Sequence, residues 1–92
     1  MQAYLACFDI IDDRIRYRAV KCLSAYGVRV QKSVFEISVN TPKELEKIKQ
    51  ELVHLLEPED DMRFYALCLN CRKKSHKHDG SRIAIYPSVV IL

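Results

Sequence analysis

The residues from 2 to 10, QAYLACFDI, constrain the fold most, because a short apolar run before an acidic turn is typical of a buried β-strand. Successive side chains of a strand face opposite sides of a sheet. Both rows here are apolar: Tyr4, Ala6, Phe8 and Ile10 form one, and Ala3, Leu5 and Cys7 form the other. When helices cover only one side of a sheet, the other side normally carries polar residues. The second row of this strand therefore needs a cover of its own.

A helix is predicted over residues 13–26, where one stripe of the helix surface is apolar: Ile15, Ala19, Cys22, Leu23 and Tyr26. Asp12 or Asp13 is suited to be its N-cap, and Gly27 is suited to stop it. The polar side of this helix is basic on both flanks. Arg16 lies on one flank, and the other flank carries Arg14, Arg18 and Lys21.

Residues 28–39 favour β-structure, but the apolar positions change parity within the run. A bulge or a very tight turn between two short strands is therefore expected near 31–33. Thr41 to Glu44 form a capping box with proline at the first helical position, which predicts a second helix. Pro58 ends that segment, and residues 62–69 are predicted as a further strand. The apolar stripe of the second helix comprises Leu45, Ile48, Leu52, Leu55 and Leu56.

This order of elements predicts a single α+β domain over residues 1–92, with two helices packed on one face of an antiparallel sheet. Ferredoxin-like βαββαβ topology suits the order best. Residues 70–82 are polar and basic and are predicted to form a flexible loop. Residues 83–92 carry no charge and are predicted to form an extra C-terminal strand.

An apolar sheet face and an uncharged terminal strand are both liabilities in a monomer. Both are removed if two copies pack sheet against sheet and exchange their C-terminal strands. We therefore expect a homodimer in which residues 83–92 form the exchanged strand.

Composition limits the function classes. No run approaches the roughly 20 apolar residues of a membrane span, and the N-terminal residues do not have the pattern of a secretory signal. A cytoplasmic protein with no membrane partner is expected, and its four cysteines are then free thiols or metal ligands. Six cations and no acid occur in residues 14–32, whereas acids collect in 44–61. This polarity suits a surface that binds phosphates, although an ordinary charged surface would look the same.

Asp9 is the candidate metal ligand, because it ends the first strand just before the turn into the first helix. Mg²⁺ in proteins is held by one or two carboxylates together with phosphate oxygens and waters. A single carboxylate equally fits a solvated turn. In the expected dimer, a twofold axis near the end of the first strand brings two Asp9 side chains together. Asp12 and Asp13 are explained by helix capping alone.

Three segments, 8–13, 29–36 and 64–68, occur together with Arg16, Arg18 and Tyr26-Gly27 between them. Together these residues resemble the Cas-two family of CRISPR-associated proteins, and the resemblance runs from residue 3 to about residue 71. The sequence departs from the family at two positions. Phe8 and Lys32 stand where tyrosine is common.

The resemblance implies a ferredoxin-like homodimer that takes part in spacer acquisition with the CRISPR integrase subunit of the Cas-one family. It also implies a metal-dependent endonuclease acting on RNA or DNA, with Asp9 binding Mg²⁺ or Mn²⁺ shared across the dimer. The family positions linked to nuclease activity are matched by Arg16, Arg18, Arg29 and Phe35, and Ser33 lies in the same motif. With Arg14 and Lys32 these residues form the predicted nucleic-acid surface.

Alternatives remain open. A non-catalytic dimer could bridge integrase dimers and hold the duplex through its basic surfaces, since no histidine that might act as a base lies near Asp9 in the sequence. A toxin-like ribonuclease follows from fold analogy alone. Cys68 and Cys71 with His76 and His78 could bind zinc, but the histidine spacing is not that of a zinc finger.

Overall fold

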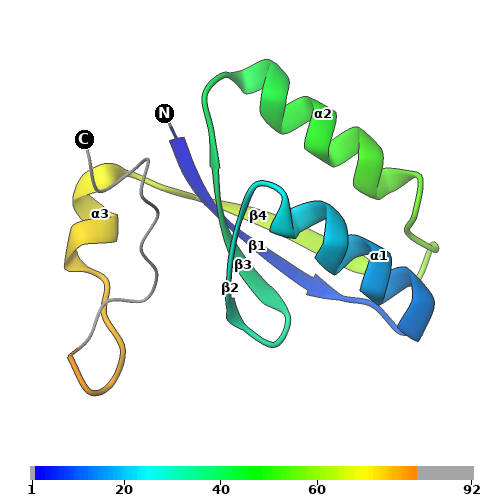
Figure 1. Cartoon of the computed structure of the whole chain (residues 1–92), viewed down its shortest axis with the longest axis horizontal. Helices are drawn as coiled ribbons and strands as arrows, with labels where there is room; N and C mark the ends of the chain where they lie inside the picture. Colours follow the sequence, from blue (N-terminus) through cyan, green and yellow to red (C-terminus); the bar gives the residue numbers. More distant parts are fainter. Residues whose placement is uncertain (1, 81–92) are drawn as a thin grey trace.

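The protein folds around one four-stranded antiparallel sheet with the strand order β2-β3-β1-β4 (Figure 1). The computed structural model describes residues 2–80. Its strands are β1 Gln2–Asp9, β2 Gly27–Gln31, β3 Val34–Val39 and β4 Asp61–Leu67. Its helices are α1 Asp13–Ser24, α2 Pro42–Val53 and the short α3 Leu69–Lys74.

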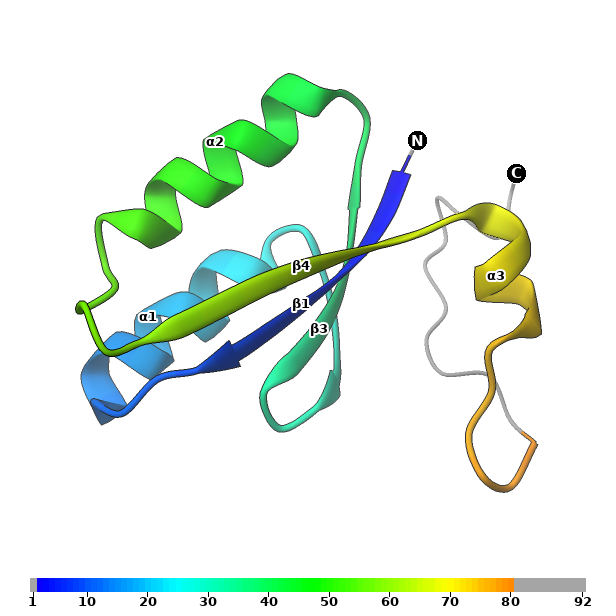
Figure 2. The same ribbon diagram turned by 180° about the vertical axis from the view of Figure 1, so that it is seen from behind.

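Helices α1 and α2 lie on the same face of the sheet, and a view from behind shows β4 and β1 in front of them (Figure 2). The element order βαββαβ and the central position of β1 and β3 are those of a ferredoxin-like fold. The predicted fold class is therefore confirmed for residues 2–80. The predicted C-terminal strand, residues 83–92, lies outside the described residues.

Both long helices begin at the predicted caps. The Asp12 carboxylate accepts hydrogen bonds from the backbone N–H groups of Arg14 and Ile15, at 2.8 and 3.1 Å. Thr41 accepts one from the N–H of Glu44 at 3.2 Å, which forms half of the predicted capping box. Helix α1 ends at Ser24, earlier than predicted, because Gly27 already belongs to β2.

The change of parity in residues 28–39 has two structural causes. The pairing of β2 with β3 shifts between Arg29 and Gln31, which is a bulge, and Lys32 and Ser33 form a two-residue turn. The sequence predicted either a bulge or a tight turn here, and the structure contains both.

The core lies between the helices and the sheet face that they cover, which we call the covered face. Its largest fully buried side chains include Phe35, Ile37, Leu23, Ile48 and Leu52. The rings of Phe8 and Phe35 stack with their centroids 6.3 Å apart. Strand β1 contributes Ala6 and Phe8 to this core, in the predicted row.

The opposite face, which we call the open face, carries the second row of β1. Across the sheet, Leu5 of β1 pairs with Glu36 of β3 and with Tyr65 of β4. A hollow of about 620 Å³ on this face is lined by Leu5, Arg29, Val30, Gln31, Val34 and by residues 76–78. The second row is therefore apolar in sequence but lies among both apolar and charged side chains, and α1 and α2 do not cover it.

Helix α3 corrects one prediction, because residues 70–74 were expected to belong to a flexible loop. Cys68, the residue after β4, caps this helix, and Arg72 forms an ion pair with Glu36 on the open face. Both side chains of the pair are at least 95% buried. A buried carboxylate needs a cation close to it, and this requirement holds the basic segment against the sheet. No helix within residues 2–80 is long and apolar enough to span a membrane.

Candidate metal and nucleic-acid site

Asp9 is the last residue of β1 and its side chain is exposed. It has the same parity as Leu5 and Cys7, so it belongs to the open face. In the pairing of β1 with β4 it lies directly opposite Asp61. Opposed residues of antiparallel strands have their Cβ atoms about 4.5–5.5 Å apart, so the sheet brings two carboxylates together. The sequence analysis did not identify Asp61.

Arg63 provides positive charge beside these carboxylates. Its Nε donates a hydrogen bond to Asp61 at 2.8 Å. Hydrogen bonds with Tyr65 and with Asp61 raise the pKa of the Arg63 guanidinium, in that order of importance. Arg63 lies opposite Cys7, where burial raises the pKa of the thiol and Arg63 opposes that rise. The open face is thus charged at its Asp9 end and mixed around Leu5, whose direct partners across the sheet are Glu36 and Tyr65.

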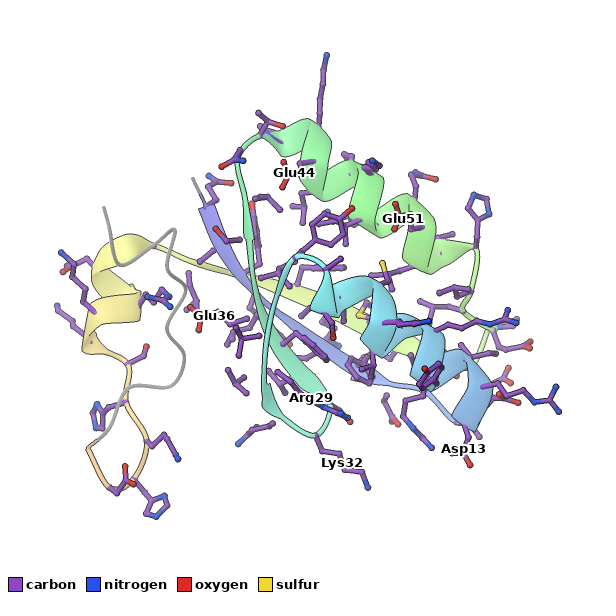
Figure 3. The ribbon with its side chains drawn as sticks, viewed as in Figure 1. Asp13, Arg29, Lys32, Glu36, Glu44 and Glu51 are labelled. Carbon is purple, nitrogen blue, oxygen red and sulfur yellow. The ribbon has the colours of Figure 1, made fainter. Side chains whose placement is uncertain are left out.

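The turn between β2 and β3 is fixed next to the end of β1. The backbone N–H of Phe8 donates to the carbonyl of Ser33 at 3.0 Å, one residue before Asp9. Arg29 donates two hydrogen bonds to the carbonyl of Lys32, at 3.0 Å from Nε and 2.6 Å from Nη2 (Figure 3). Ser33 and Arg29 therefore shape the surroundings of Asp9 through the backbone, while Lys32 is exposed.

Arg16 is held at the corner between β1 and α1. Its Nη1 donates to the carbonyl of Ile10 at 2.7 Å, and Nη2 forms an ion pair with Asp13. Its side chain is 35% exposed. Arg16 thus fixes the chain that follows Asp9, and part of its guanidinium surface remains accessible.

Two predicted cations of α1, Arg14 and Arg18, are exposed on the same side of the helix. Together with Asp12 and Ile15 they line a surface depression of about 310 Å³. Tyr17, 63% exposed, lies between them in the sequence, and the Lys21 ammonium lies 5.8 Å from the centre of its ring. This flank of α1 can contact phosphates without any rearrangement.

Phe35 was predicted to belong to the nucleic-acid surface, and its position contradicts a direct contact. The side chain is 1% exposed on the covered face, where it stacks on Phe8. The Arg29 guanidinium lies 5.9 Å from the centre of the Phe35 ring, at the edge of the sheet. Phe35 therefore supports Arg29 and the core. The shared parity of Phe35 with Ile37 and Val39 already indicated this role.

Asp9 and Asp61 provide carboxylate oxygens, which are the donors that hard cations such as Mg²⁺ prefer. Within residues 2–80, no three side chains of the types His, Cys, Asp and Glu come together as a metal site. That range includes the four residues considered for zinc. The donor set at the end of β1 fits a cation with few protein ligands.

The family model described as CRISPR associated protein Cas2 matches residues 1–75. The chain belongs to this family. It is 40% identical over 72 residues to the CRISPR-associated endoribonuclease Cas2 4 of Rhodospirillum rubrum, and the match covers 77% of this chain and 57% of that protein. The chain therefore matches only a little over half of the length of that relative.

Two solved Cas2 structures share the fold. A chain of the partial Cas6-RT-Cas1–Cas2 complex is 35% identical with a TM-score of 0.82, and the match covers 94% of this chain and all of that one. Streptococcus pyogenes Cas2 at pH 6.5 is 32% identical with a TM-score of 0.74, and the match covers 82% of this chain and 96% of that one. These similarities support the ferredoxin-like Cas2 fold.

Proposed function

We propose that this Cas2 family member acts as a homodimer in CRISPR spacer acquisition, together with a CRISPR integrase subunit of the Cas-one family. The supporting comparison is with a chain of the partial Cas6-RT-Cas1–Cas2 complex, which aligns over 94% of the present chain. The proposed activity is metal-dependent hydrolysis of phosphodiester bonds in RNA or DNA. The name of the Rhodospirillum rubrum relative, an endoribonuclease, supports the same class of reaction.

The observation that carries the proposal is the placement of Asp9 and Asp61 on the open face. The same face carries the apolar side chains around Leu5 and the exposed ring of Tyr65. If a second copy covers this face, the carboxylates at the charged end of each sheet approach the partner subunit. Formation of the dimer would then bury the open faces and bring the two Asp9 side chains together at the same time.

Asp9 of each subunit would hold the cation, and Asp61 would add negative charge beside it. A bound Mg²⁺ or Mn²⁺ supplies an activated water and neutralises charge on the scissile phosphate. Arg63, held on Asp61, limits the repulsion between neighbouring carboxylates. Ser33 and Arg29 keep the β2–β3 turn beside the end of β1, so the turn stays close to Asp9.

Arg14 and Arg18 would bind backbone phosphates, which provide affinity without reading the sequence. Both are exposed and lie side by side on α1, whereas Arg16 is partly occupied by Ile10 and Asp13. Lys32 would extend the same positive surface from the β2–β3 turn.

A second candidate function is a non-catalytic dimer that bridges two integrase dimers and holds DNA through its basic surfaces. The observation that favours it is the sparse donor set at the end of β1. No third metal-binding side chain joins Asp9 and Asp61 among the described residues. Phosphate binding by Arg14 and Arg18 serves both functions, so only the acidic residues distinguish them.

The discriminating experiment replaces Asp9 with Asn and measures cleavage and spacer acquisition separately. With Mg²⁺ or Mn²⁺ present, we expect Asp9→Asn to lower the cleavage rate at least about a hundredfold, as removal of a main charge-stabilising group does. The control is Glu59→Gln, which removes an exposed carboxylate from the loop between α2 and β4. Its cleavage rate should not change.

The outcomes separate the two candidates. Loss of cleavage with retained acquisition supports the bridging role in the cell. Loss of both, with intact dimerisation and partner binding, supports catalysis. An unchanged cleavage rate in Asp9→Asn contradicts the metal-site assignment.

A further inference from the structure

The four cysteines fall into two chemically different pairs. Cys7 and Cys22 are partly buried, whereas Cys68 and Cys71 are exposed. The Cys22 thiol donates to the Glu51 carboxylate at 3.2 Å, between α1 and α2. Burial, and then this carboxylate, raise the pKa of Cys22 to about 12. Burial also raises the pKa of Cys7. The first pair is therefore protonated and unreactive at neutral pH.

Cys68 and Cys71 are arranged in the opposite way. Cys68 lies between β4 and α3, and its Sγ accepts a hydrogen bond from the backbone N–H of Cys71 at 3.1 Å. The Cys71 side chain is the main cause that lowers the pKa of Cys68, and the backbone N–H of Cys71 adds to it. The Cys68 side chain in turn raises the pKa of Cys71. The two cysteines are thus exposed, linked by a backbone hydrogen bond to the Cys68 sulfur, and different in acidity.

We propose that Cys68 and Cys71 form a redox-active dithiol, in which Cys68 attacks a disulfide of a low-molecular-weight thiol and Cys71 resolves the product. The Cys68 thiolate forms a bond to one sulfur of the disulfide and releases the other as a thiolate. Cys71 loses its proton to solvent and attacks the Cys68 sulfur, which releases the second small thiolate. Two electrons pass from the protein to the small disulfide, which becomes two thiols.

The spacing and the local fold favour this intramolecular closure. Two cysteines separated by two residues on one helical turn are common in thiol–disulfide chemistry. The backbone hydrogen bond already holds the Cys68 sulfur against the first turn of α3, which contains Cys71. Closure fixes the first turn of α3, and the next residue, Arg72, makes the buried ion pair with Glu36. The modification therefore acts on the segment that is attached to the open face.

A zinc site is the competing explanation of the same pair. Cys68, Cys71, His76 and His78 all belong to the described residues, and no three of them come together there. The Nδ1 atom of His76 lies 3.1 Å from the carbonyl of Lys74. The dithiol needs only Cys68 and Cys71, which the backbone hydrogen bond already links.

The test is a redox titration of the full-length protein in mixtures of oxidised and reduced glutathione at neutral pH. Samples are quenched in acid, free thiols are alkylated after unfolding, and the cysteines are mapped by mass spectrometry. We expect the native protein to lose two hydrogens, with the disulfide between Cys68 and Cys71. Cys7 and Cys22 should remain alkylatable throughout and serve as internal controls.

Single variants assign the two roles. In Cys71→Ser, the mixed disulfide with glutathione should accumulate on Cys68. In Cys68→Ser, Cys71 should react with glutathione disulfide more slowly than Cys68 does in Cys71→Ser, because the backbone N–H of Cys71 stabilises a thiolate only at position 68. Cys22→Ser is the matched control and should leave the titration unchanged. Circular dichroism of each variant checks that the fold is retained.

Three results would overturn the proposal. The first is the absence of a disulfide between these residues at every glutathione ratio. The second is faster reaction of Cys71 than of Cys68 in the single variants. The third is stoichiometric binding of added Zn²⁺ that requires both Cys68 and Cys71 and that protects their thiols from oxidation.

Discussion

The covered face and the open face of the sheet are built from alternate residues of the same strands. On the covered face, Phe35, Ile37 and Ala6 are buried by α1 and α2 of the same chain. On the open face, Leu5 is partly exposed and Tyr65 is exposed. Glu36 is fully buried there, and Arg72 from α3 neutralises its charge. One face is completed within the subunit, and the other carries the acidic site and an apolar surface.

This difference separates stability from function. Hydrophobic burial on the covered face is independent of protein concentration, whereas covering of the open face by a second copy depends on it. Substitutions on the first face should therefore change the free energy of unfolding, and substitutions on the second should change assembly. The predictions below test this division, from the largest expected effect to the smallest.

The largest effect is expected for Phe35→Ala on the covered face. Removing a fully buried ring leaves a cavity beside Phe8, and such changes cost about 4 kcal/mol of unfolding free energy. Urea unfolding at two protein concentrations measures it. Phe35→Leu is the milder control, and its affinity for nucleic acid should equal that of the native protein. A selective loss of affinity in Phe35→Leu would show that the ring contacts the ligand after all.

The second effect concerns the ion pair that joins α3 to the open face. Arg72→Met keeps much of the side-chain volume but leaves Glu36 buried without this cation, which costs about 3 kcal/mol. The double variant Glu36→Gln with Arg72→Met should recover a large part of the loss, because the buried charge is then gone. Urea unfolding of the native protein, of Arg72→Met and of the double variant measures how much of the unfolding free energy is recovered. Equal destabilisation by the single and the double variant would contradict a buried ion pair.

The third effect tests whether a second copy covers the open face. Tyr65 is 49% exposed, so Tyr65→Glu should be tolerated in a folded monomer. A charge placed in an apolar interface should raise the dimer Kd at least about a hundredfold, or ~2.7 kcal/mol. Sedimentation over a range of concentrations measures the shift. Val53→Glu, at a 62% exposed position on α2, is the matched control and should not change the Kd. A native protein that stays monomeric at micromolar concentration would contradict the dimer itself.

Local features of the structure were predictable from the sequence, and long-range pairings were not. The two apolar rows of β1 and the caps Asp12 and Thr41 depend on neighbouring residues, so periodicity and composition identify them. The pairing of Asp61 with Asp9 depends on the register between strands that are about fifty residues apart. That register follows from turn geometry and from the packing of whole strands, which the local pattern of one segment does not give.

The basic segment after β4 shows the same limit. Residues 70–74 have the composition of a loop, and their charge indicated that they are exposed to solvent. Their position against the sheet involves one distant partner, because Glu36 is buried on β3 and Arg72 neutralises its charge. The misplacement of Phe35 had a different origin. The family motif suggested a ligand contact, while the parity of β3 already assigned the ring to the core.

The smallest effect concerns Asp12, the cap of the helix that covers the core face. Hydrogen bonds from the N–H groups of Ile15 and Arg14 lower the pKa of Asp12 in the folded state. Its contribution to stability is therefore fully present above its unfolded pKa of about 3.9 and is lost as the pH falls through the lower folded value. Asp12→Ala should be less stable than the native protein at pH 7, and this difference should shrink as the pH falls below about 4. Asp12→Asn keeps an accepting oxygen and should lose less stability than Asp12→Ala. Urea unfolding across this pH range measures both variants, and a difference that grows toward acid would contradict the assigned cap.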